Sequence, residues 1–178
     1  MGNFFWQGMW HPLLVPAHTL VLVALGLLAG QQGGRVLRLS CVAYAGAVTL
    51  GLVLTRLLAV GNGELTLLLL ALVCGGLAAL QWHLPVGLVV VLALVAGVVI
   101  GLDSAVTLIP GLRGGRVYAQ WLGTGLGSVL VLVLSGVIGF YLHKLWQGIA
   151  VRVLGAWVTA GTIMVLTLLL SKLFKVIP

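Results

Sequence analysis

Residues 12–30 read PLLVPAHTLVLVALGLLAG, a run in which one histidine and one threonine are the only polar side chains. A helix needs roughly 20 such residues to cross the hydrocarbon core of a bilayer. The run does not alternate strictly between apolar and polar residues, as a transmembrane β-strand does. It therefore predicts a membrane-spanning helix.

The rest of the chain has the same character. Of its 178 residues, 62% are hydrophobic and only 6% are charged, whereas about 25% of a typical soluble domain is charged. We therefore predict an all-α, polytopic transmembrane bundle of about six spans, forming a single domain over residues 1–178. The predicted spans are residues 12–30, 37–60, 65–81, 86–102, 117–142 and 149–170.

The formal net charge is +7, but the basic residues are scattered near the ends of the predicted spans. This distribution fits membrane topology and contact with lipid headgroups, and it argues against nucleic acid as a partner. Arg and Lys divide almost evenly between the two sides of a six-span protein, so charge alone predicts no orientation.

Two histidines, His11 and His18, lie seven residues apart at the start of the first predicted span. An ionisable residue inside a span indicates a functional site, and histidine is the commonest metal ligand. In a straight helix the two residues share a face but lie about 10.5 Å apart along the axis. Two ligands of one metal ion must lie within about 4 Å of each other, so a regular helix cannot place both on one ion.

Two prolines alter this expectation. Pro12 suits the first turn of a helix, so we expect the helix to begin near His11. Pro16 then falls inside the helix, where it removes the hydrogen bond to the carbonyl of Pro12 and introduces a kink. The freed carbonyl needs another donor, and the kink would bring His11 inward. The alternative is that His11 lies at the membrane interface and His18 hydrogen-bonds to a neighbouring helix.

The chain has only two acids. Glu64 begins the third predicted span, where a negative charge complements the helix dipole. Asp103 ends the fourth, where a negative charge is unfavourable and calls for a partner such as Arg113 or Arg116. No nucleophile–base pair or phosphate-binding loop is visible, so we predict that the protein is not an enzyme and holds no resident cofactor.

Glycines spaced four residues apart allow two helices to approach closely in a membrane. Such pairs serve either packing within the bundle or contact with another molecule. They are Gly26 with Gly30, Gly97 with Gly101, and Gly123 with Gly127.

Residues 8–35 resemble the first-helix signature of the HupE/UreJ family, small bacterial membrane proteins encoded with nickel hydrogenase and urease genes. The family acid that precedes the second histidine is Ala17 here, so the ligand set implied by the resemblance is partly lost. The residues that carry the resemblance are Gly8, His11, Pro12, His18, Gly26, Gly33, Gly34 and Arg35.

The resemblance implies a multi-pass protein of the cell inner membrane that takes up or handles nickel or cobalt. It carries His11 and His18 over as metal-handling positions, and Glu64 and Asp103 are the remaining candidate ligands. The alternative is a non-catalytic accessory or structural subunit. Such a subunit would join a homo-oligomer or a larger membrane complex through its glycine-rich helix faces. A transporter should keep acids on the faces of its spans, whereas a packing subunit need not.

Overall fold

The computed structural model describes residues 2–55, 63–104 and 114–175, which form helices and no strand. Five of these helices are long and apolar enough to cross a membrane, and the bent pair α1–α2 makes a sixth candidate span. The prediction of an all-α membrane bundle of about six spans is therefore confirmed. The helices are α1 (Gly2–Leu14), α2 (Pro16–Gln31), α3 (Gly34–Leu54), α4 (Gly63–Leu80), α5 (Val86–Asp103), α6 (Gly114–Leu145) and α7 (Ile149–Lys175).

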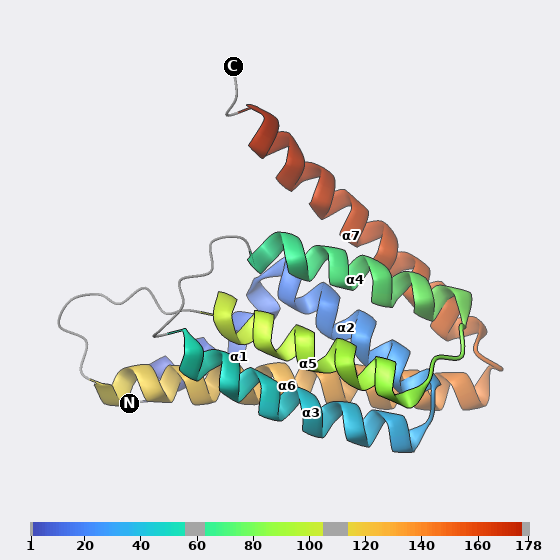
Figure 1. The fold of residues 1–178 in the computed structure, drawn as a ribbon, viewed down its shortest axis with the longest axis horizontal. Helices are drawn as coiled ribbons and strands as arrows, with labels where there is room; N and C mark the ends of the chain where they lie inside the picture. Colours follow the sequence, from blue (N-terminus) through green and yellow to red (C-terminus); the bar gives the residue numbers. More distant parts are fainter. Residues whose placement is uncertain (1, 56–62, 105–113, 176–178) are drawn as a thin grey trace.

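Helix α2 is the centre of the bundle (Figure 1). It is almost wholly buried from Ala17 to Gln31, and it contacts each of the other described helices. A helix that is apolar on all sides is stable only when other helices surround it. The core therefore forms around the run that begins at residue 12. Its largest buried side chains on α2 are Leu22, Leu25, Leu27 and Leu28.

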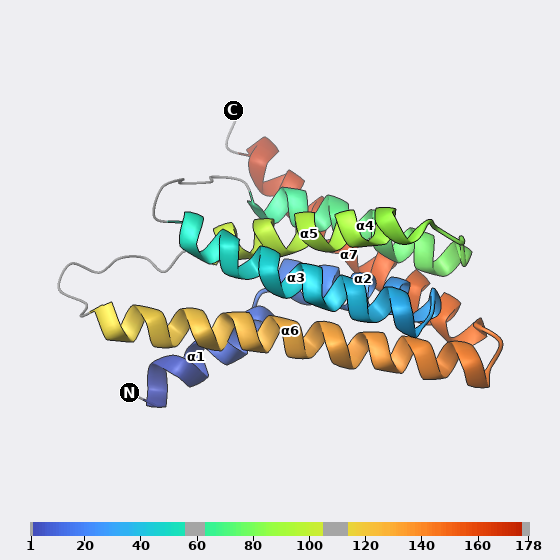
Figure 2. The same ribbon diagram turned by 60° about the horizontal axis from the view of Figure 1, so that its bottom comes forward.

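The other helices pair around this centre. Helix α5 packs along α3, α4 packs against α7, and α1 lies across the first half of α6 (Figure 2). Helix α7 then diverges from the bundle (Figure 1). The connections at residues 32–33, 81–85 and 146–148 lie together at one end, which we call the loop end. The opposite end, where α2 begins and α5 ends, is the site end.

The structure confirms the kink predicted at Pro16 but places Pro12 away from the first turn of a helix. Helix α1 begins at Gly2 and contains Pro12, while Pro16 starts α2. The ring of a proline disfavours the helical conformation of the residue before it, and Val15 is accordingly extended, with φ −95° and ψ 110°. The chain bends by 72° between α1 and α2. The predicted span 12–30 therefore contains a break at Val15, and its continuous helix begins at Pro16.

Other predicted limits shift less. Residues 56–60 of the second predicted span lie outside the described residues. Helix α6 extends the predicted 117–142 at both ends, and α7 continues past residue 170 to Lys175.

The carbonyl freed by Pro16 does find a donor. Thr19 Oγ1 donates to the Pro12 carbonyl oxygen at 2.8 Å. This bond replaces the one that the proline nitrogen cannot make, and it ties the end of α1 to the first turn of α2.

Replacing Thr19 with valine keeps the shape of the side chain but removes this donor. We expect a loss of about 1 kcal/mol of stability, because the Pro12 carbonyl becomes unsatisfied. Thermal unfolding of the purified protein in detergent measures the loss. Thr49→Val is the matched control, since Thr49 is exposed and donates only to Gly46 within its own helix. Equal losses in the two variants would contradict the role given to Thr19.

The paired glycines lie at contacts between helices of this chain. Gly26 and Gly30 pack against α6, Gly97 and Gly101 against α3, and a Cβ at Gly123 or Gly127 would overlap the backbone of α1. Contact with a second copy or a larger complex stays a prediction, and it would require other surfaces.

Candidate metal centre

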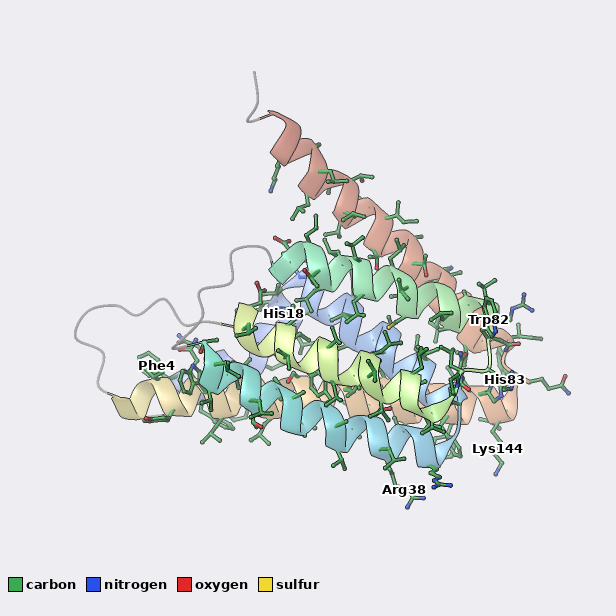
Figure 3. The ribbon with its side chains drawn as sticks, viewed as in Figure 1. Phe4, His18, Arg38, Trp82, His83 and Lys144 are labelled. Atoms are coloured by element: carbon green, nitrogen blue, oxygen red, sulfur yellow. The ribbon has the colours of Figure 1, made fainter. Side chains whose placement is uncertain are left out.

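The site end contains a side-chain hydrogen bond between two helices distant in sequence. His18 Nε2 lies 2.9 Å from Asp103 Oδ2. The His18 side chain is 1% exposed and that of Asp103 is 24% exposed. Figure 3 shows His18 at the site end, opposite Trp82 and His83 at the loop end. This contact agrees with the alternative interpretation of the sequence, in which His18 hydrogen-bonds to a neighbouring helix.

The bend at Val15 brings the second histidine to the same place. The ring centroids of His11 and His18 are 5.6 Å apart, with an edge-to-face angle of 73°. A straight helix would separate the two residues by about 10.5 Å along its axis. His11 itself is half-buried. The break between α1 and α2 therefore changes two distant side chains into neighbours.

The second ring nitrogen of His18 has no hydrogen-bond partner among the described residues. Nδ1 is buried and unbonded there, while Nε2 is bonded to Asp103. A metal-bound histidine commonly donates its other ring N–H to a carboxylate, which fixes the tautomer and makes the ligand nitrogen more basic. In this arrangement Nδ1 is the nitrogen that could bind a cation, and Asp103 is the group that orients the ring.

The two acids differ in their surroundings. The carboxylate of Asp103 packs over Gly63, where an added Cβ would lie 2.5 Å from Oδ1. Glu64 is the next residue and also lies at the site end, but its side chain is exposed. The structure therefore brings His11, His18 and Asp103 together and leaves Glu64 outside the group.

The described residues contain no group of three or more His, Cys, Asp or Glu side chains that could hold a metal ion as they stand. His11 and His18 contact each other, but Asp103 is oriented toward His18 rather than toward a shared point. Among the described residues, no further His, Cys, Asp or Glu side chain therefore completes a metal site with His11 and His18.

The sequence predicted a partner for Asp103 such as Arg113 or Arg116. Arg113 and the side chain of Arg116 lie outside the described residues, and the partner that the structure gives is His18. A lone acid at the end of one span and a histidine in another are complementary. No local pattern, however, links residues 85 positions apart.

Comparison with protein families matches residues 1–165 of this chain to the family described as HupE / UreJ protein. No curated protein and no solved structure matches the chain. The match covers most of the 178 residues, including both histidines and Asp103. The chain therefore belongs to the HupE/UreJ family and is a multi-pass membrane protein.

Proposed function

We propose that this protein handles a divalent ion of the nickel or cobalt class as cargo, at the site end, in the cell inner membrane. The observation that carries the proposal is the convergence of His11 on His18 at 5.6 Å between ring centroids. The unpartnered Nδ1 of His18 adds to it. Modest rotations of the two rings would bring one nitrogen from each within the roughly 4 Å that a shared ion requires.

The chemistry of the group suits such an ion. Imidazole nitrogen is a good ligand for Ni²⁺ and Co²⁺. Asp103 contacts His18, and its negative charge offsets part of the charge of a divalent ion in a low-dielectric environment. The set is smaller than a permanent metal site needs, which favours transient handling by a carrier or accessory protein that performs no catalysis.

The test is uptake of Ni²⁺ and Co²⁺ into liposomes that contain the purified protein. We expect uptake above that of empty liposomes, and a loss of about tenfold or more in His18→Ala, because a ligand is removed. His83→Ala is the matched control, since His83 is an exposed histidine at the loop end. Uptake by the wild-type protein equal to that of empty liposomes would contradict transport.

A second candidate is an accessory subunit of a larger membrane assembly or a homo-oligomer. It is favoured by α7, of which only 11% of the spanning window is buried. This helix presents the exposed side chains of Trp157, Met164 and Leu168. Size-exclusion chromatography after mild solubilisation distinguishes a stable assembly from the monomer. Normal metal uptake by the isolated monomer would contradict the accessory role.

A further inference from the structure

The loop end carries basic side chains and no acid. The two acids of the chain, Glu64 and Asp103, both lie at the site end. Figure 3 shows Arg38 and Lys144 projecting outward at the loop end. The exposed basic side chains there are Arg35, Arg38, Lys144 and Arg152.

The same end holds buried polar atoms that have no hydrogen-bond partner in the part of the chain that the structure describes. Gln31, the last residue of α2, is 8% exposed, and neither Nε2 nor Oε1 of its amide makes a hydrogen bond. Gln81 Nε2 and His143 Nδ1 are also buried and unpartnered. Such atoms are rare in folded proteins and are expensive where the dielectric constant is low. Four such atoms on three residues at one end of the bundle indicate a ligand.

Two of these groups meet over Gly148. This glycine has φ +83°, in the left-handed region that favours a residue without a Cβ. An added Cβ would overlap Gln81 Nε2 and lie 3.0 Å from His143 Nδ1. The amide nitrogen and the ring nitrogen therefore face the same bare backbone.

Helix register places the third group beside them. Helices α2 and α6 run in the same direction (Figure 2), and the backbone of Leu27 packs against Gly139. One helical turn further along each helix stand Gln31 and His143. Gly30 packs against the backbone of Gly136 and Phe140. Gln31 therefore lies within about one helical turn of His143 along the bundle.

The aromatic residues of this end indicate its depth in the membrane. Trp82 and Trp146 are 63% and 64% exposed and lie in two of its connections. Tryptophan is enriched where the headgroups meet the hydrocarbon. The basic residues and the unpartnered amides thus stand at the level of lipid phosphates.

We propose that the loop end binds the headgroup of an anionic, glycerol-bearing phospholipid such as phosphatidylglycerol. The phosphate oxygens accept hydrogen bonds from the amide nitrogens of Gln31 and Gln81, and Lys144 supplies charge. The headgroup hydroxyls donate to Gln31 Oε1 and His143 Nδ1. A phosphocholine headgroup has the phosphate but lacks the hydroxyl donors, and it carries a positive charge toward the basic residues.

The experiment uses the full chain in detergent micelles, titrated with short-chain phosphatidylglycerol or phosphatidylcholine, with bound lipid counted by native mass spectrometry. We expect about a tenfold preference for phosphatidylglycerol. Gln31→Met and Gln81→Met keep the side-chain volume and remove only polar atoms. Each should abolish most of the preference and leave the unfolding temperature unchanged or higher, because an unsatisfied group is removed. If Gln31→Met fails to fold, Gln81→Met decides, since it lies in a connection.

Two lysine variants and competition by soluble phosphates distinguish a specific lipid site from general electrostatic attraction between the protein and anionic lipid. Lys144→Gln should weaken phosphatidylglycerol binding by about fivefold, whereas Lys172→Gln, the same change on an exposed lysine near the end of α7, should not. Equal effects of the two lysine variants would overturn the proposal, as would an unchanged preference in both glutamine variants. Competition by glycerol phosphate or inorganic phosphate as strong as that by the lipid would overturn the assignment to a lipid.

Discussion

Exchanging Asp103 for asparagine is expected to lower the affinity for Ni²⁺ by about 10- to 100-fold while the fold is kept. Asparagine retains an oxygen that accepts a hydrogen bond from His18 Nε2, so the 2.9 Å contact can persist. The lost charge had made Nδ1 a stronger ligand and had offset part of the charge of the ion. Isothermal titration with Ni²⁺ in detergent measures the affinity, and thermal unfolding checks the fold.

Glu64→Gln is the control for this variant, because it removes the only other acid, which is exposed at the start of α4. Its effect on Ni²⁺ affinity should be small, since an exposed charge is well screened by solvent. Affinity should also fall on acidification in the wild-type protein, because a protonated imidazole cannot bind the ion. Equal affinities of the two acid variants would refute the orienting role of Asp103.

Replacing Gly97 with leucine is expected to destabilise the bundle by about 3 kcal/mol. An added Cβ would lie 2.7 Å from Ala47 Cβ, 2.9 Å from the Tyr44 carbonyl oxygen and 3.0 Å from the Val48 nitrogen. Two of these three atoms belong to the backbone of α3, so no side-chain rotation relieves the overlap. Unfolding in detergent by increasing SDS, followed by tryptophan fluorescence, measures the loss.

Gly87→Leu is the matched control on the same helix. Nothing lies within 4 Å of the Cβ position at Gly87, so the side chain would extend into open space. We expect little change in stability or a small gain, because leucine favours the helix more than glycine does. A loss as large as that of Gly97→Leu would show that glycine acts through helix propensity rather than through close packing.

Apolar runs were sufficient to predict most of the bundle. The gap between the predicted spans 12–30 and 37–60 contains Gly33, whose φ of +111° favours glycine. The charges at span ends added little, because Arg and Lys divide almost evenly between the two sides of a six-span protein. Fold class was accessible from sequence because the bilayer imposes helix length and apolar composition directly.

Only part of the candidate metal centre could be predicted from the sequence. His11 and His18 were identified from their chemistry and the kink was expected at Pro16, but Pro12 was wrongly assigned to the first turn of the helix. Proline is compatible with either the first turn or a break, and only packing of α1 across α6 decides between them. The pairing of His18 with Asp103 depends on how α2 and α5 lie in space. No periodicity in either helix encodes that contact.

The length of α6 has a consequence for how deep the candidate site lies in a bilayer. Its 32 residues extend about 48 Å, whereas the hydrocarbon layer is about 30 Å thick. With Lys144 at one surface, Ser135, which donates to the Leu22 carbonyl, is nine residues deeper. His18 lies one turn beyond Leu22, or about 20 Å below that surface. A cation entering from the other surface would therefore cross only about a third of the hydrocarbon before reaching His18.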